Sequence, residues 1–357
     1  MEKLNVAIIG QGRSGKGIHG RYFLGEQNQY YKVKYLVETD EHRRRVAKET
    51  YADCMVLSDY TELFNKTDIN LVVNATYSDL HYSITKALLE HDFNVLVEKP
   101  FARDYNECQT LINIANEHKK VLAVFQQAFF APYYKKALEF INSGKLGKIE
   151  QISIRFNNFC RRWDWQTLQK RLGGNLYNTG PHPIGMAMGF LEFDKNISVL
   201  YSKLDSSSLF SGDADSYCKI LLSALDKPLV DIEINHTDAF HDYVIKIQGT
   251  NGTFQTNAEA FKVKYIIDGE NPKRPVCETF ISDENNNPCY CAEELIIHEE
   301  DGKYDGTVFN VATMEFYEDL YFYITQKKEL RITTAMITQV MRIIEQVHKD
   351  NPLQVKY

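Results

Sequence analysis

The 357-residue sequence lacks the features of a membrane or exported protein. No apolar run reaches the roughly 18 residues that a membrane-spanning helix requires. The chain starts with MEKLNVAIIG, which leads straight into a predicted strand and has neither the charged nor the apolar region of a signal peptide. We therefore expect a cytoplasmic protein that does not act on membranes.

Cysteine pairs and excess positive charge are also missing. The seven cysteines are irregularly spaced and odd in number, so no disulfide framework is predicted. Cys289 and Cys291 are separated by one residue rather than the two of a zinc knuckle, and no second pair accompanies them. The net charge of −7 lacks the basic excess of nucleic-acid binders. We expect reduced thiols, no metal and no nucleic-acid partner.

The first third of the chain alternates strand and helix patterns. Short apolar runs are separated by amphipathic segments that begin at capping residues such as Asp40 and Asp104. Strands without internal alternation, separated by helices, predict a doubly wound parallel sheet with helices on both faces. The predicted strands are 5–9, 33–38, 70–75, 94–97 and 121–125, and the predicted helices are 15–27, one after Asp40, 78–91 and 104–118.

The pattern changes after about residue 125. A helix is predicted at 131–143. Strands with alternating apolar residues are predicted at 217–223, 229–235 and 243–248, and two amphipathic helices at 309–326 and 334–348. We therefore predict an α/β protein of two domains. Residues 1–125 would form a Rossmann domain, and residues 126–357 a C-terminal α+β domain on a largely antiparallel sheet.

A glycine motif follows the first predicted strand directly. Gly10, Gly12 and Gly15 form a complete G-x-G-x-x-G between a strand and a helix, which is the context of a dinucleotide-binding turn. The first glycine permits the tight turn, the second lets a pyrophosphate approach the backbone, and the third lets helix and strand pack closely. We predict cofactor contacts from the whole turn: Gly10, Gln11, Gly12, Arg13, Ser14 and Gly15.

The second predicted strand ends in Glu38, about 25 residues beyond the motif. An acid at this position accepts hydrogen bonds from the ribose hydroxyls of NAD and repels the 2′-phosphate of NADP. Glu38 therefore favours NAD, with NADP the less expected cofactor. Arg43 to Arg45 lie on the next helix, and one of them could reach a 2′-phosphate.

A charged pair stands at the end of an apolar strand in VLVEKPF, residues 95–101. Parallel sheets bind ligands at the carboxyl ends of their strands, which is where Glu98 and Lys99 lie. The Lys99 ammonium could bind a substrate hydroxyl or stabilise negative charge on a reacting oxygen, and Pro100 fixes the backbone after it. The alternative is an ordinary surface ion pair.

The segment GGNLYNTGPHPIG, residues 173–185, places His182 in a turn rich in glycine and proline before a predicted helix at 184–190. Histidine is a candidate general base because its ordinary pKa lies near neutrality. Asn178 lies four residues earlier and would orient the substrate or the imidazole. Asp164 and Tyr177 are the next candidates for the base.

These motifs together resemble the Gfo/Idh/MocA family, the glucose–fructose oxidoreductase and inositol dehydrogenase group. The resemblance covers essentially the whole chain and is carried by the glycine turn, the strand-end EKP and the GG…H segment. It implies an NAD(P)-dependent dehydrogenase or reductase of sugars or cyclitols, in which Lys99 is the catalytic lysine and His182 the acid/base. It also implies a homodimer or homotetramer built through the C-terminal sheet. We assign further cofactor contacts to Ala75, Thr76, His81, Glu98, Lys99 and Gln127.

Two positions depart from the family pattern. Many members carry Asp where this chain has Asn178, and an amide cannot supply the charge that would raise the pKa of His182. The family often has a stretch like Asn-Arg-Arg after the last Rossmann strand, where this chain has Gln126-Gln127-Ala128. The strength of the base is affected, but not its position.

Two polar segments are candidates for substrate binding. The first segment contains Arg161, Arg162, Trp163, Asp164 and Trp165, which together with Lys99, Asn178 and His182 could bind a polyhydroxylated ring by stacking and bidentate hydrogen bonds. The first five could instead form a surface loop with buried tryptophans. His236, Asp238, His241 and Asp242 have the composition of a metal site, but on a strand residues 236 and 241 would point to opposite faces, which argues against a shared metal.

Three functions remain open on this reading. The first is a reversible NAD-linked dehydrogenase of a sugar, glycoside or inositol. The second is a hydrolase or lyase that uses bound NAD to oxidise a ring hydroxyl transiently. The third is a non-catalytic dinucleotide-dependent regulator, which the presence of both Lys99 and His182 disfavours. The residues do not name the substrate, the carbon oxidised or the direction of the reaction.

Overall fold

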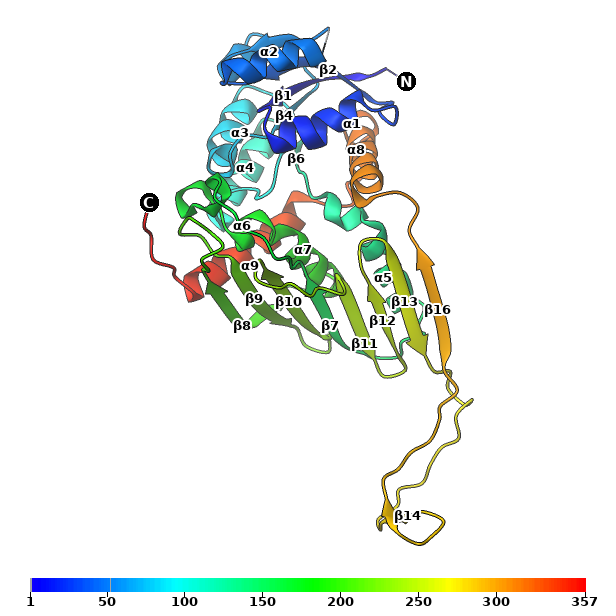
Figure 1. Ribbon diagram of the computed structural model, residues 1–357. Helices are drawn as coiled ribbons and strands as arrows, with labels where there is room; N and C mark the ends of the chain where they lie inside the picture. Colours follow the sequence, from blue (N-terminus) through cyan, green and yellow to red (C-terminus); the bar gives the residue numbers. More distant parts are fainter. Residues whose placement is uncertain (1, 52) are drawn as a thin grey trace.

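The computed structural model describes residues 2–51 and 53–357. Its N-terminal part is a parallel sheet of six strands in the order β3-β2-β1-β4-β5-β6 (Figure 1). The strands are β1 Leu4–Ile9, β2 Tyr31–Val37, β3 Met55–Leu57, β4 Leu71–Asn74, β5 Val95–Val97 and β6 Leu122–Val124. The chain reverses its direction of winding between β1 and β4, so the carboxyl ends of these strands open a crevice.

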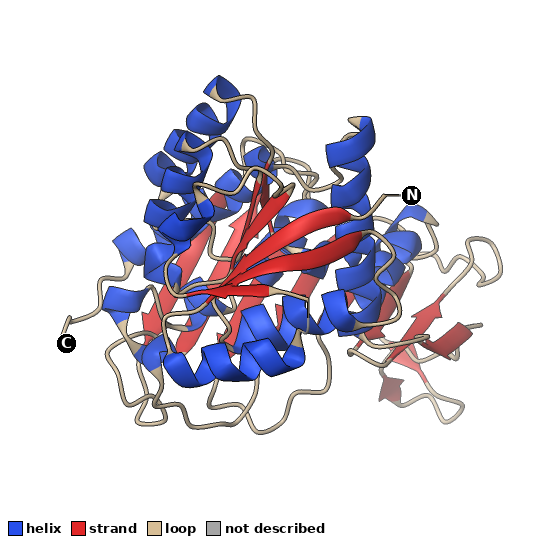
Figure 2. Ribbon diagram, turned by 90° about the horizontal axis from the view of Figure 1, so that it is seen from above, coloured by secondary structure: helices blue, strands red, loops and turns tan. Residues whose placement is uncertain are grey.

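Helices cover both faces of this sheet (Figure 2). They are the π-helix η1 Gly15–Gly20, α1 Arg21–Leu24, α2 Glu41–Thr50, η2 Tyr60–Leu63, η3 Ser78–Leu80, α3 His81–Glu90 and α4 Tyr105–Glu117. The predicted caps are confirmed, because the side chains of Asp40 and Asp104 accept hydrogen bonds from the amides of Arg43 and Glu107. The three-residue strand β3 was not predicted.

The C-terminal part is a sheet of eight strands in the order β16-β13-β12-β11-β7-β10-β9-β8. Only the pair of β7 and β10 is parallel. The predicted fold class is therefore confirmed. The strands are β7 Ile149–Arg155, β8 Ser198–Asp205, β9 Tyr217–Ser223, β10 Leu229–Asn235, β11 Ile245–Gly249, β12 Gly252–Thr256, β13 Ala260–Tyr265 and β16 His298–Lys303.

Helices pack against one face of this second sheet, mainly α5, α7 and α9 (Figure 1). The helices of this part are η4 Gln127–Phe130, α5 Pro132–Asn142, η5 Trp165–Thr167, η6 Gln169–Arg171, α6 Asn175–Asn178, α7 Pro181–Phe190, α8 Val308–Gln326 and α9 Thr334–Asp350. No helix in the described residues is long and apolar enough to cross a membrane.

The late helix α8 returns to the N-terminal sheet and joins the two parts. Its Tyr317 ring stacks on Tyr22, with ring centroids 4.5 Å apart, and its backbone carbonyl accepts a hydrogen bond from the Tyr31 hydroxyl at 2.8 Å. One continuous apolar core therefore runs through both parts. This shared core fixes the crevice between them.

A long excursion leaves the body between β13 and β16. Residues 266–297 form an arm whose tip is a small hairpin of β14 Ile281–Ser282 and β15 Pro288–Cys289 (Figure 1). Its apolar side chains include Tyr290, which is 97% exposed. None of the seven cysteines, all in the described residues, forms a disulfide.

Candidate active site

The glycine-rich turn has the geometry that a dinucleotide requires. Gly10 has a φ of +94°, and a Cβ on it would lie 2.6 Å from the Ala75 carbonyl oxygen. A Cβ on Gly15 would lie 1.8 Å from the Gly10 carbonyl oxygen, so helix and strand are in direct backbone contact. A Cβ on Gly12 would instead meet nothing within 4 Å. Gly12 thus leaves open space at a helix start, where a pyrophosphate would fit.

Glu38 lies against this turn at the end of β2. Its side chain is 5% exposed, and one carboxylate oxygen accepts a hydrogen bond from the Gln11 amide at 2.7 Å. The other oxygen accepts from the Asp40 amide at 2.9 Å and lies 3.8 Å from the Arg43 guanidinium. The acid is therefore held beside the turn, and its contact with the cofactor ribose stays a prediction.

The residues after β4 form the next part of the crevice wall. His81 is buried, with Nδ1 2.7 Å from the Pro100 carbonyl oxygen and Nε2 3.3 Å from the Thr76 carbonyl oxygen. Burial lowers the pKa of His81. The ring thus braces two loops that end at the crevice. Direct contact of Ala75, Thr76 or His81 with a cofactor stays a prediction.

Glu98 is buried in a chain of side chains that joins three elements. Its Oε1 lies 3.1 Å from His19 Nε2, and His19 Nδ1 lies 2.6 Å from the Tyr317 hydroxyl on α8. Burial alone would raise the pKa of Glu98, but the hydrogen bond from His19 and the charges of His19 and Lys99 lower it to about 2. The carboxylate therefore holds η1, β5 and α8 together, and its predicted cofactor contact stays a prediction.

Lys99 reaches across the crevice from the end of β5. Its Nζ donates to the Asn178 backbone oxygen at 2.7 Å and lies 3.5 Å from the Asn178 side-chain oxygen. Burial lowers the pKa of Lys99. The charge of Glu98 opposes this change, and the charges of Arg13 and Arg162 lower the pKa further. The following peptide bond to Pro100 is cis. The motif is thus a tethered ammonium in the crevice, not a surface ion pair.

His182 lies in the first turn of α7, which begins at Pro181, earlier than predicted. Its Nδ1 is buried and has no hydrogen-bond partner in the described part of the chain. Burial, and then the charge of Lys99, lower the pKa of His182 to about 3, against the opposing effect of Glu98. The sequence shows only the ordinary histidine pKa, because it does not reveal how far the ring is desolvated.

The turn that presents Asn178 depends on an acid that the sequence analysis missed. Asp215 is 1% exposed, and its carboxylate accepts a hydrogen bond from the Leu176 amide at 2.8 Å at the start of α6. Burial raises the pKa of Asp215 to about 7. Gly174 has a φ of +95° there, and a Cβ on it would lie 2.0 Å from the same carboxylate. Asp215 belongs to no motif, so no pattern in the sequence points to it.

The residues after β6 brace α7. Gln126 is fully buried, and its side-chain amide donates to the Pro181 carbonyl oxygen next to His182. The side-chain oxygen of Gln127 is buried and has no partner among the described residues. The stretch that departs from the family pattern thus fixes the start of α7, and cofactor binding by Gln127 stays a prediction.

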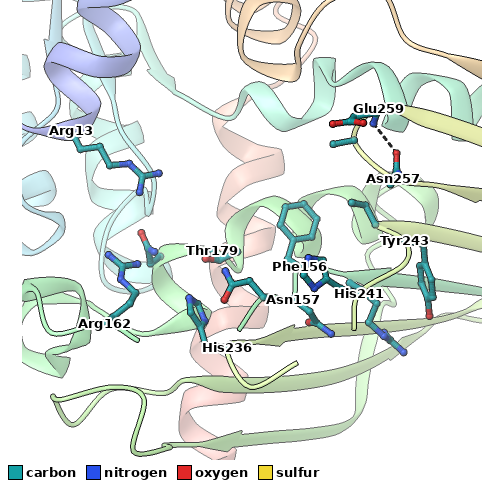
Figure 3. A pocket seen from close by; sticks show the side chains of 15 residues that line it. Arg13, Phe156, Asn157, Arg162, Thr179, His236, His241, Tyr243, Asn257 and Glu259 are labelled. Carbon is teal, nitrogen blue, oxygen red and sulfur yellow. Dashed lines mark hydrogen bonds between the residues drawn. The ribbon is translucent and has the colours of Figure 1, made fainter. Parts of the chain in front are cut away.

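A cavity of about 610 Å³ opens between the two parts of the molecule. Arg13, Arg162 and Asn178 line one end, and Glu259 lines the other (Figure 3). His236 also lines it; it is 5% exposed, and burial followed by the charge of Arg162 lowers its pKa to about 4. Much of this wall comes from loops and strand ends that the sequence analysis did not single out.

The predicted substrate loop lies only partly at this cavity. Its lining includes Arg162 but none of Arg161, Trp163, Asp164 and Trp165. Trp163 is 76% exposed, Asp164 binds Arg162 at 2.7 Å, and the Trp165 ring packs on Tyr77 with centroids 5.0 Å apart. The alternative of a loop with buried tryptophans is wrong for Trp163, and substrate binding by these four residues stays a prediction.

Two further details of the site were mispredicted. Residues 236–242 lie outside the strands, so the argument from opposite strand faces was wrong, and both His236 and His241 line the cavity. In the described residues, no three His, Cys, Asp or Glu side chains are placed to hold a metal ion. Tyr177 is a poor reserve base, because its hydroxyl donates to the Arg103 backbone oxygen at 2.8 Å and its ring stacks on His348.

A Rossmann sheet with a glycine turn and a strand-end acid defines a nicotinamide-dinucleotide-binding oxidoreductase. The chain belongs to the Gfo/Idh/MocA family. Residues 4–126 match the model described as "Oxidoreductase family, NAD-binding Rossmann fold", and residues 134–255 match the GFO/IDH/MocA C-terminal domain. The predicted family and NAD as cofactor are confirmed; NADP is not excluded.

Several curated proteins are similar to the chain. Uncharacterized oxidoreductase YhhX of Escherichia coli is 30% identical over 44% of this chain and 45% of its own length. The 2,7-anhydro-N-acetylneuraminate hydratase of Mediterraneibacter gnavus is 23% identical over 83% of this chain and 78% of its own. The scyllo-inositol 2-dehydrogenase (NADP(+)) IolW of Bacillus subtilis is 26% identical over 56% of this chain and 54% of its own. The chain thus spans about half the length of YhhX and IolW.

Solved structures share the fold over nearly the whole chain. The putative oxidoreductase yvaA of Bacillus subtilis superposes with a TM-score of 0.78 at 18% identity, covering 98% of this chain and 95% of its own. GenD2 from gentamicin A biosynthesis, solved in complex with NAD, superposes with a TM-score of 0.77 at 18% identity, covering 98% of this chain and 94% of its own.

Proposed function

We propose that this protein transfers a hydride between NAD and a ring hydroxyl or ketone of a sugar, glycoside or inositol. The observation that carries the proposal is the position of Lys99. Its ammonium lies at the carboxyl end of β5, 2.7 Å from the Asn178 backbone oxygen, and its charge acts on His182 on the facing helix. A cation and an imidazole that meet at the crevice of a Rossmann sheet suit the oxidation of an alcohol.

The residues of the chain divide the chemistry between them. Bound NAD supplies the group that accepts or returns the hydride. Lys99 binds the reacting oxygen and stabilises the negative charge that develops on it. His182 takes the hydroxyl proton in the oxidative direction, because its lowered pKa keeps the imidazole neutral at pH 7. The open space at Gly12 and the amides of the following helix hold the pyrophosphate.

A screen of sugars, glycosides and cyclitols with NAD, followed by the absorbance of NADH, tests this function. Net NADH formation with a free sugar or cyclitol supports it. Cleavage or hydration of a substrate without net NADH formation would instead favour transient use of NAD. That second candidate has one observation in its favour: the relative from Mediterraneibacter gnavus, whose match covers 83% of this chain, is named a hydratase. Lack of any turnover would favour a non-catalytic regulator.

The preference for NAD should depend on Glu38. The Glu38 carboxylate is held at the glycine turn, where by this proposal it would meet a 2′-phosphate, and two negative charges in a partly dry crevice repel each other by several kcal/mol. Wild-type protein should therefore bind NAD more tightly than NADP by on the order of 10²-fold, and Glu38→Ser should narrow that gap. Calorimetric titration with both cofactors measures it. Glu41→Ser, an exposed acid three residues on, is the control and should change nothing. Wild-type binding of NADP as tight as that of NAD would refute the assignment.

We also propose that the chain forms a homodimer or homotetramer through its C-terminal sheet. The residues of β9 alternate between buried and partly exposed, and helices α5, α7 and α9 lie on one face of the sheet while Figure 1 shows the other face bare. The partly exposed side chains of this face include Tyr217 and Leu221 beside the ion pair of Lys219 and Asp231, a broad mixed surface that could pair with a second copy. Light scattering should give the mass of two or four chains, and the mass of one chain would contradict the proposal.

A further inference from the structure

The orientation of the Asn178 side chain is fixed by its neighbours. Arg162 can only donate, so the Gln166 side-chain oxygen must face it, as it does. Gln166 Nε2 then donates to Asn178 Oδ1 at 2.7 Å, and Lys99, another pure donor, approaches the same oxygen at 3.5 Å. Because Arg162 and Lys99 can only donate, they determine the orientation of the side-chain amides of Gln166 and Asn178 between them.

This arrangement leaves the Asn178 Nδ2 group for the cavity. Asn178 lines the cavity, and Nδ2 has no acceptor among residues 2–51 and 53–357. An Asp at this position would present an acceptor to the ligand instead of a donor. With Asn178 in place of the Asp of the family pattern, residue 178 therefore offers the ligand a hydrogen-bond donor instead of an acceptor.

The same end of the cavity carries an excess of donors and positive charge. Figure 3 shows Arg13 and Arg162 at the same end of the cavity, from the two parts of the molecule, and the charges of both act on Lys99 and lower its pKa. Asp164 accepts a hydrogen bond from Arg162 Nη2, and Glu98 lies against His19, while Arg162 Nη1 and Nε have no acceptor among the described residues. A bound pyrophosphate would take Arg13, which leaves Arg162, Lys99 and the Asn178 amide. His236, 5% exposed, lines the same wall, and its Nδ1 is buried and has no hydrogen-bond partner among the described residues.

We propose that the substrate is an anionic sugar derivative, a uronate or a sugar phosphate, whose anionic group is received by Arg162 and the Asn178 amide. The proposal rests on the proposed function and deepens it. Charge-assisted hydrogen bonds from a guanidinium and an amide suit an anionic oxygen group, which accepts from several donors at once. Gln166 is a positioning residue, because it touches the substrate only through Asn178.

Specificity constants with NAD provide the test. The substrates are the uronates of glucose, galactose and mannose, their methyl esters as neutral counterparts, the parent hexoses and the hexose 6-phosphates. The anionic member of a set should exceed its neutral counterparts by about 10- to 100-fold in kcat/KM. Whether a uronate or a hexose 6-phosphate has the higher kcat/KM identifies which anionic group is recognised.

Two variants separate this role from a merely structural one. Asn178→Asp should lower the ratio of uronate to methyl ester at least about tenfold, because the new carboxylate repels the anion. Gln166→Met should lower the same ratio while the Kd for NAD stays unchanged, since the Asn178 amide is then free to turn. Loss of folding would lower both members of the ratio equally, so a ratio that holds in both variants overturns the assignment.

Failure of the inference is distinguishable from failure of the proposed function. Turnover of neutral sugars as fast as that of anionic ones overturns the anionic substrate and leaves the dehydrogenase intact. If no sugar is turned over, the function fails, and calorimetric titration of the NADH-bound protein with the same panel still decides the inference. Binding of the anions in preference to their esters supports it, and equal or absent binding overturns it.

Discussion

The Lys99→Met variant should bind NAD with nearly unchanged affinity and turn over substrate about 10²- to 10³-fold more slowly than the wild type, as expected when a donor to a developing oxyanion is lost. The ammonium donates to the Asn178 backbone oxygen across the crevice, and we assign it to the reacting oxygen rather than to the pyrophosphate. Its loss is therefore felt in the transition state rather than in cofactor binding. Met keeps most of the packing of the lysine stem. Steady-state kinetics and calorimetric titration with NAD measure the two quantities separately.

A second substitution of Lys99 and a control at an exposed lysine accompany this measurement. Lys99→Ala should lose turnover to the same extent, and Lys148→Met, which alters a 76% exposed lysine at the far end of β7, should behave as wild type. If affinity for NAD and turnover fall together in Lys99→Met, the lysine is structural. Thermal unfolding of each variant shows whether such a loss comes from the fold.

The elements of the fold were predictable because their signals are local. The uninterrupted apolar runs of the first third and the alternating runs after residue 217 each follow from the burial of their own strand. The bounds of β9 and β10 were predicted to the residue. The strand β3 has only the three residues MVL, too few to show any period. Glu38 and Lys99 could be placed at the crevice because parallel strands end there together.

The partners of the site residues could not be predicted, since they come from distant parts of the chain. His19 and Tyr317 are 298 positions apart, yet the hydrogen bond between them orients the imidazole that binds Glu98. Asp215, which orders the turn before Asn178, lies in a loop between β8 and β9 with no periodic signal. The lowered pKa of His182 depends on burial of the ring and on the charge of Lys99 from the other part of the molecule, and both exist only in the assembled crevice.

His182→Ala should lower the oxidation rate by about 10²- to 10⁴-fold, the usual value of a positioned acid or base. In this direction a neutral imidazole must take the hydroxyl proton. Burial and the charge of Lys99 lower the pKa of His182 from 6.5 to about 3, so the neutral form persists as pH falls below the usual histidine range. The acidic limb of the oxidation pH–rate profile should therefore lie well below pH 6.5 in the wild type. The profile of kcat/KM with saturating NAD measures it.

Asn178→Asp should move that limb to higher pH. A carboxylate four residues before His182 stabilises the imidazolium, which raises the pKa of the ring, and the base is then lost to protonation at a higher pH than in the wild type. The amide that now occupies the position supplies no such charge. A limb that stays in place or moves to lower pH in Asn178→Asp would show that residues 178 and 182 are not electrostatically coupled. A limb that survives in His182→Ala would show that another group is the base, and Asp164, held beside the cavity by Arg162, is then the residue to replace.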